Sequence, residues 1–220
     1  MELMNRINDG MRWLYVCIYN SFVLSMVIGI PAIMIPLLVQ NYFLLICGFY
    51  LYNAFILFPV MISLHGIMLR FLNEKDIDNF WRRFTSGFKD SFSKGVGVGM
   101  ILSAVAAVFL LAVIFYWTSL FKWFFVALAA IVIAMISFIF PMMANREMSV
   151  LSYISNSFFF VFLSPVIAVT LLLNLFVIFY VLNKVTFILM LFPGLGLVTL
   201  VNSYGYCLIS EKYLEEDDSK

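Results

Sequence analysis

The chain has 220 residues, of which 65% are hydrophobic and only 11% are charged. An ordinary soluble domain is about 45–50% apolar and about 25% charged, so this composition excludes a typical soluble fold and indicates a protein surrounded by lipid. The formal net charge of +1 gives no long-range field that would attract nucleic acid. We therefore expect membrane lipids as partners of this chain, and no nucleic acid.

Six apolar stretches are long enough to cross a bilayer, which takes about 20 residues of helix. They are residues 13–39, 42–69, 95–117, 123–144, 158–182 and 185–209. Every Asp, Glu, Lys and Arg falls outside these windows, as expected where a charge buried in lipid costs several kcal/mol. The sequence therefore predicts an all-α fold, a polytopic transmembrane helix bundle of about six spans that forms a single integral membrane domain over residues 1–220.

The basic residues predict the orientation of these spans. Of the 13 Lys and Arg residues, 11 lie in the termini and in the loops that this topology places on one side. Only Lys122 and Lys184 fall on the other side. Because cytoplasmic loops carry the excess of Lys and Arg, we expect a multi-pass membrane protein with both termini in the cytoplasm.

Residues 76–94 form the one segment outside the predicted spans with a strong periodic pattern. On a helix, its apolar residues fall on one face and its charged residues on the opposite face. The apolar face holds Ile77, Phe80, Trp81, Phe84, Phe88 and Phe92, and the polar face holds Arg82, Arg83, Ser86, Lys89 and Asp90. The pattern predicts an amphipathic cytoplasmic helix at the membrane interface.

Three interpretations of this amphipathic segment are open. It lies on the cytoplasmic leaflet as an elbow that leads into the third span, or it packs its aromatic face on the protein's own bundle. Alternatively, it is a docking surface for a cytoplasmic partner. The residues that would dock a partner or contact the membrane interface are Phe80, Trp81, Arg82, Arg83, Phe84, Phe88 and Phe92.

The spans hold few groups capable of chemistry. There is one histidine, His65, and no Asp or Glu lies inside a span, so we expect no catalytic residues, no metal site, no cofactor and no enzymatic activity. Polar side chains do occur within the spans, where they can hydrogen-bond between helices or line a polar path. These candidate intramembrane contacts are Asn20, Asn53, His65, Asn174 and Asn202.

The order of several motifs resembles that of the YesL-like family of small bacterial membrane proteins. The matching motifs are Trp13-Leu-Tyr, Phe58-Pro59 followed by Arg70, the aromatic and basic runs 80–84 and 88–92 before a glycine-rich span start, and Ser155-Asn-Ser-Phe158. The resemblance implies five or six spans and a genomic setting near carbohydrate importers of the ATP-binding-cassette (ABC) type. It implies no catalytic residues.

Two functions follow as hypotheses. The first is a non-enzymatic accessory subunit or assembly factor of a bacterial carbohydrate ABC importer, with the permease or nucleotide-binding subunits as partners. The alternative is a self-sufficient transporter or channel for a small neutral solute. Prolines such as Pro59 inside spans, together with the intramembrane asparagines, favour this alternative if they mark broken helices around a site. Simple packing kinks explain the same prolines.

Overall fold

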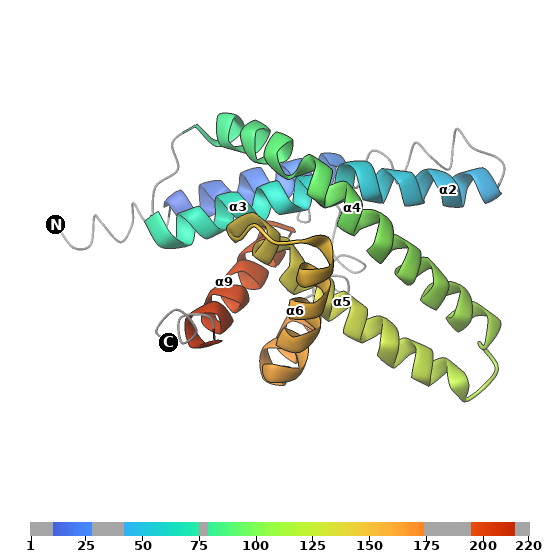
Figure 1. The fold of residues 1–220 in the computed structure, drawn as a ribbon. Helices are drawn as coiled ribbons and strands as arrows, with labels where there is room; N and C mark the ends of the chain where they lie inside the picture. The colour runs from blue at the N-terminus through green and yellow to red at the C-terminus, as the bar shows by residue number, and fades with distance from the viewer. Residues whose placement is uncertain (1–10, 28–41, 75–78, 174–194, 214–220) are drawn as a thin grey trace.

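The computed structural model describes residues 11–27, 42–74, 79–173 and 195–213, and the described part of the chain is helical, with no strand (Figure 1). An N-terminal helix, Met11–Val27, comes first. It is followed by α2 (Tyr42–Tyr52), a π-helix (Asn53–Leu57), α3 (Phe58–Glu74), α4 (Phe80–Phe115), α5 (Phe121–Asn145), α6 (Val150–Leu163) and α9 (Leu195–Tyr213). A short helix, Pro165–Leu173, lies directly after α6.

Three helical stretches are long and apolar enough to cross a membrane: Tyr50–Glu74, Phe80–Val113 and Phe121–Asn145. A fourth exists if α6 and Pro165–Leu173, which meet at an angle of 97°, are counted as one bent span. The prediction of an all-α membrane bundle is therefore confirmed. Parts of the predicted spans 13–39, 158–182 and 185–209 lie outside the described residues.

The second predicted span, residues 42–69, belongs to one unbroken run of helix from Tyr42 to Glu74. Pro59 lies inside this run, although proline has no N–H group for the helical ladder. The π-helix ends just before it, and the Phe58 N–H donates to the Asn53 carbonyl, five residues back. This wider turn accommodates the proline, so Pro59 does not break the helix.

Residues 80–94 of the amphipathic segment and residues 95–115 of the predicted third span form one helix, whereas Ile77 lies outside the described residues. α4 has 36 residues and no interruption, so the elbow that the first interpretation placed between the two segments is absent. Its charged part, residues 80–94, runs antiparallel to α3. Glycines allow the close approach: a Cβ on Gly99 would lie 3.0 Å from the Cα of Ala54, and one on Gly95 would lie 3.3 Å from the Cα of Pro59. The amphipathic segment therefore lies beside residues that hydropathy assigns to the second span.

The later part of α4 and α5 form an apolar hairpin, whose tip extends away from the other helices while the second half of α5 packs against them (Figure 1). At its tip the Lys122 ammonium lies 5.5 Å from the ring of Trp117 and 5.4 Å from that of Trp123, an arrangement typical of a membrane interface. At 1.5 Å per residue, Lys94 to Trp117 and Trp123 to Arg146 each span about 34 Å. Both limbs thus match the hydrocarbon thickness of about 30 Å.

α3 lies at the centre of the described bundle and packs against α4, α5 and α9. One apolar core joins α3 to α5, α6 and α9, with Phe58, Phe138 and Tyr206 among its buried members. A second core joins α3 to the N-terminal helix and to the start of α4 through Leu24, Leu64 and Phe80. The position of α3 between these cores leaves one of its faces open to a groove.

Candidate functional site

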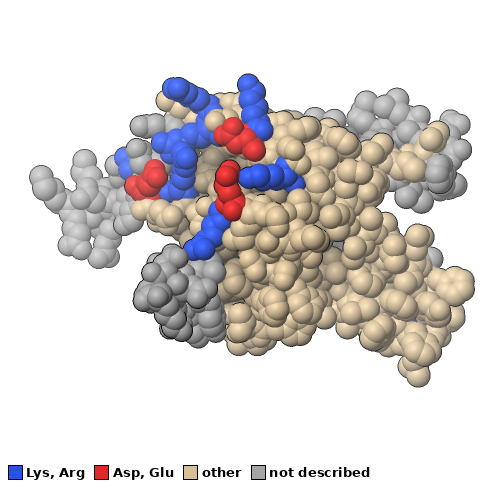
Figure 2. Space-filling view, viewed as in Figure 1, with Lys and Arg blue, Asp and Glu red and all other residues tan. Residues whose placement is uncertain are grey.

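A polar groove of about 810 Å³ lies between the end of α3, the start of α4 and the loop after α5. Figure 2 shows the charged side chains gathered at this end of the molecule, with the rest of the visible described surface almost free of charge. The polar side chains that line the groove are Ser63, Arg70, Asn73, Glu74, Asn79, Arg82, Arg83, Ser86, Asp90, Ser91, Lys94, Asn145, Arg146 and Glu147. We call this feature the polar groove.

Polar residues that recur on one face of α3 and on one face of α4 form two walls of the polar groove. On α3, Ser63, Gly66, Arg70 and Asn73 recur every three or four residues, so they share one face. On α4, the polar face predicted from the sequence, including Arg82, points to the same space. The apolar side chains in the lining are Ile62, Ile67, Leu69, Met143 and Ala144. The groove therefore offers charged and apolar surface together.

The two helical walls are held at close range by a serine and a glycine. The Ser63 hydroxyl, on a side chain that is almost fully buried, donates to the Phe84 carbonyl at 2.8 Å. A Cβ on Gly87 would lie 3.0 Å from the Ser63 Oγ. These contacts tie the amphipathic part of α4 to α3, and they place the groove beside residues 63–67, which the sequence assigned to the second span.

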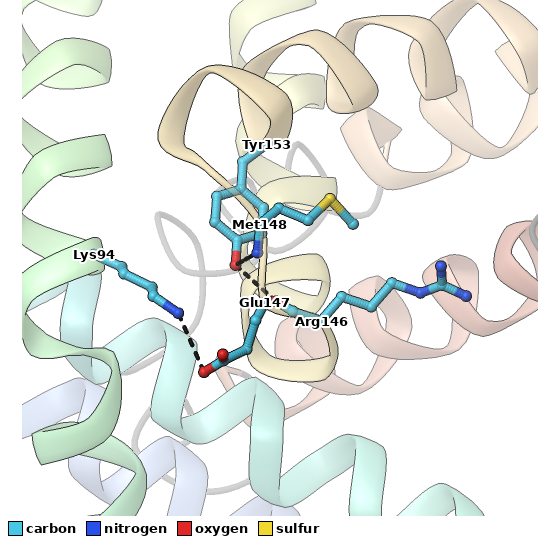
Figure 3. A network of polar contacts seen from close by, with 5 residues as sticks. All are labelled: Lys94, Arg146, Glu147, Met148 and Tyr153. Carbon is cyan, nitrogen blue, oxygen red and sulfur yellow. Dashed lines mark hydrogen bonds and ion pairs between the residues drawn. The ribbon is translucent and has the colours of Figure 1, made fainter.

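The third wall is the connection between α5 and α6, and a network of polar contacts fixes it (Figure 3). The Lys94 Nζ lies 3.2 Å from the Glu147 Oε1, which joins α4 to this loop. The hydroxyl of the fully buried Tyr153 donates to the Arg146 carbonyl at 2.6 Å and accepts from the Met148 N–H at 2.9 Å. The loop is therefore anchored from both sides.

Positive charge predominates in the polar groove. Its basic residues come from all three walls and its acidic residues are fewer: Arg70, Arg82, Arg83, Lys94 and Arg146 against Glu74, Asp90 and Glu147. Within the groove Lys94 pairs with Glu147, and Asp90 accepts a 3.3 Å hydrogen bond from Ser86. The arrangement favours an anionic group.

The structure divides the predicted interface residues between three environments. Phe80 is 3% exposed and packs in the core, so it is not accessible to a partner. Phe84 and Phe88 are half-buried and pack against the same core, as the second interpretation of the segment expected. Arg82 and Arg83 line the polar groove, whereas Trp81 (49% exposed) and Phe92 remain on the surface.

Trp81 stands at the edge of a second, wholly apolar depression of about 360 Å³. We call it the apolar groove. Its lining comes from the N-terminal helix, from the region around Pro59 and from α4, and it consists of Phe22, Val23, Met26, Val27, Ile56, Val60, Trp81, Phe84 and Phe88. Since no polar side chain lines it, the apolar groove suits an acyl chain or an apolar helix.

The intramembrane polar residues predicted from the sequence are only partly brought together. The Asn20 Nδ2 donates to the Thr199 Oγ1 at 3.0 Å, and the Thr199 hydroxyl donates to the Gly196 carbonyl at 2.8 Å. This buried chain joins the N-terminal helix to α9. Asn202 is buried on the next turn of α9.

The remaining three candidates are not part of that chain. Asn53 begins the π-helix, and Asn174 lies outside the described residues. His65 is fully buried on α3, where its ring stacks on Phe140 at a centroid distance of 5.6 Å. Its Nδ1 lies 2.7 Å from the Met61 carbonyl, so Nδ1 carries the proton and donates it. The Nε2 has no hydrogen-bond partner among the described residues.

Sequence reasoning missed several residues of the polar groove. Ser63 and Gly66 read as part of an apolar span, Arg146 contributed only to the predicted orientation, and Glu147 and Tyr153 were not among the predicted site residues. The recurrence of Ser63, Gly66, Arg70 and Asn73 on one helical face is a sequence signal that points to α3. Over the described ranges, no group of three or more His, Cys, Asp or Glu residues is placed to hold a metal ion.

These features define an integral membrane protein built from helices, with a charged groove where an apolar hairpin begins. A family model described as "Protein of unknown function, DUF624" matches residues 37–113. The match covers α2, α3 and nearly all of α4, and it is consistent with the resemblance noted in the sequence. No curated protein and no solved structure matches the chain.

Proposed function

We propose that this chain is a non-enzymatic accessory subunit or assembly factor of a bacterial carbohydrate importer of the ABC type. The family resemblance supplies the carbohydrate context. The sequence supports a role without catalysis, because one histidine and no intramembrane carboxylate leave no acid–base pair for chemistry inside the membrane. The excess of basic residues supports cytoplasmic termini and a cytoplasmic polar groove in the bacterial cell membrane.

The observation that carries this proposal is the apolar groove beside Trp81. Its lining holds no polar side chain, and three helices contribute to it. Trp81 is 49% exposed at its edge, and tryptophan is one of the residue types enriched at the energetic centres of protein interfaces. A helix of the permease subunit would fill this groove and cover Trp81.

The test is an affinity purification of the tagged full chain from its native cell in mild detergent, with the co-purifying proteins identified by mass spectrometry. The parent protein should recover permease and nucleotide-binding subunits of a carbohydrate importer in stoichiometric amounts. Trp81→Ala should reduce this recovery, whereas Trp117→Ala, which removes an exposed tryptophan at the hairpin tip, should leave it unchanged. Phe84 is a poor target because it packs in the core.

Two results would contradict the proposal. If the chain purifies alone, it is not a subunit of an importer, and the proposal fails. Equal recovery with Trp81→Ala and the parent would show that the apolar groove is not the contact surface.

A self-sufficient transporter for a small neutral solute is the second candidate. The observation that favours it is the buried polar chain from Asn20 through Thr199 to α9, together with the Oδ1 atoms of Asn20 and Asn202, which lack a hydrogen-bond partner within the described ranges. Solute flux into liposomes that contain only this protein, abolished by Asn202→Ala, would support this function. Absence of flux over a broad panel of neutral solutes would count against it.

A further inference from the structure

We propose that the polar groove binds the headgroup of an anionic phospholipid, with its phosphate held by arginines from separate walls. The inference does not depend on the importer proposal, because it concerns a different surface. Its starting point is the position of the basic residues: Arg70 comes from α3, Arg82 from α4 and Arg146 from the loop after α5. Residues so far apart in sequence meet only because the chain folds around this space.

The geometry of the groove suits a phosphate group. Guanidinium groups donate parallel hydrogen bonds to phosphate oxygens and are preferred wherever a phosphate is recognised by its shape. The groove volume of about 810 Å³ lies within the range of sites for small organic molecules. Asn73, Asn79 and Asn145 add neutral groups at the same surface, which suit the hydroxyl and ester groups around a lipid phosphate.

The location of the groove favours a lipid over a free anion. Lys94 and Arg146 both stand at the charged ends of the two hairpin limbs, each of which spans about 34 Å to the tryptophans at the tip. They therefore mark the level of the lipid headgroups. Arg146 lines the groove itself, and Lys94 lines it while paired with Glu147.

The mixed lining of the groove also favours an amphiphile. The half-buried apolar residues Met143 and Ala144 of α5 line the same groove as the arginines, whereas the apolar lining residues of α3 are buried in the cores beneath it. An acidic peptide or inorganic phosphate would leave this apolar surface without a partner. A phospholipid uses both surfaces, since its apolar acyl chains begin close to its anionic phosphate. Basic pockets between membrane helices bind anionic headgroups in this way.

The experiment uses the full chain purified in mild detergent and native mass spectrometry to count retained lipids. The probes are phosphatidylglycerol, phosphatidylcholine, inorganic phosphate and a short polyglutamate peptide, each added at equal concentration. We expect retention of phosphatidylglycerol and weaker retention of phosphatidylcholine. Arg82→Gln and Arg146→Gln should each weaken phosphatidylglycerol binding about three- to tenfold, as the loss of a partly exposed charge-assisted contact predicts.

Lys89→Gln is the matched control. Lys89 lies on the same helix as Arg82 and is exposed, but it does not line the groove, so its loss removes the same charge without touching the site. Circular dichroism of each variant confirms that the helices are intact. If Lys89→Gln and Arg82→Gln weaken phosphatidylglycerol binding equally, binding depends only on the net charge of the protein, and the proposal is overturned.

The other probes separate the alternative ligands. Inorganic phosphate that displaces phosphatidylglycerol at equal concentration would show a site for a free anion and would refute the lipid assignment. Preferential binding of polyglutamate would show a peptide site and refute it as well. Equal retention of phosphatidylcholine and phosphatidylglycerol would show that the negative charge is not recognised.

Discussion

The packing of α3 against α4, which forms the polar groove, can be tested at two glycines of α4. A Cβ on Gly99 would lie 3.0 Å from the Ala54 Cα and 3.0 Å from the Phe58 Cγ, closer than the 3.4–4 Å of ordinary contact. A Cβ on Gly97 would meet only the Val150 Cγ2, at 3.6 Å. The same substitution by alanine should therefore act in opposite directions at two positions half a turn apart.

The expected magnitudes follow from two opposing terms. Alanine stabilises a helix interior by about 1 kcal/mol relative to glycine. At Gly99 the added methyl group forces the helices apart by a few tenths of an ångström, and overpacking of this kind costs about 1–3 kcal/mol. Gly99→Ala should thus lower the free energy of unfolding by about 0–2 kcal/mol, whereas Gly97→Ala should raise it by about 0.5–1 kcal/mol.

The assay is unfolding of the full chain in mixed micelles with increasing dodecyl sulfate, followed by circular dichroism and tryptophan fluorescence. Gly97→Ala should unfold at a higher detergent fraction than the parent, and Gly99→Ala at a lower one. The difference between the two variants is the decisive quantity, because both share the same change in helix propensity. If Gly99→Ala unfolds at the same point as Gly97→Ala or later, the close approach of α3 and α4 is refuted.

Three further substitutions test other contacts in the same unfolding assay. Gly196→Ala should be the most destabilising, because its Cβ would overlap the Cys17 carbonyl oxygen. Wild-type stability of this variant would refute the contact between α9 and the N-terminal helix. Tyr153→Phe should lower the free energy of unfolding by about 1–3 kcal/mol, since it leaves a carbonyl and an N–H of the α5–α6 loop without partners. An unchanged free energy of unfolding would show that water replaces the hydroxyl. Lys94→Gln should lower the free energy of unfolding by less than about 1 kcal/mol, because its partner Glu147 is 93% exposed, and this loss should disappear at high salt. A loss that does not depend on salt would show that Lys94 stabilises the fold by something other than this ion pair.

Much of the fold follows from the sequence, because hydropathy and the exclusion of charge from long windows report directly on transfer into lipid. The window 123–144 lies within α5, whereas the window 95–117 covers only the later part of α4 and runs past its end at Phe115. Of the polar face that the amphipathic pattern predicted, Arg82, Arg83, Ser86 and Asp90 line the groove, whereas Lys89 does not.

The polar groove was not predictable from the same patterns. A hydropathy window averages the preference of consecutive residues for lipid over water. It takes no account of neighbours that are distant in sequence. Ser63 and Gly66 were therefore assigned to a span, although they face the charged side of α4. Whether the aromatic face of α4 packs on its own bundle or on a partner is likewise a question of tertiary packing, which periodicity does not address. Phe80 reads like Trp81 in the sequence, yet only Trp81 is exposed.

The most direct test of this account asks whether water reaches Gly66, which hydropathy places in the membrane and the structure places in the polar groove. The measurement is the labelling of Gly66→Cys with a polar maleimide in membrane fragments that the reagent can reach from both faces. The three native cysteines are replaced by alanine in this variant. Maleimides react with the thiolate, which forms only where water is present. Gly66 accepts the side chain because its Cβ would meet only the Ala144 Cβ at 3.6 Å. Leu51→Cys, on an exposed apolar surface away from the groove, is the control. Rapid labelling at position 66 with slow labelling at position 51 is the predicted result, and equally slow labelling at both positions would contradict the polar groove.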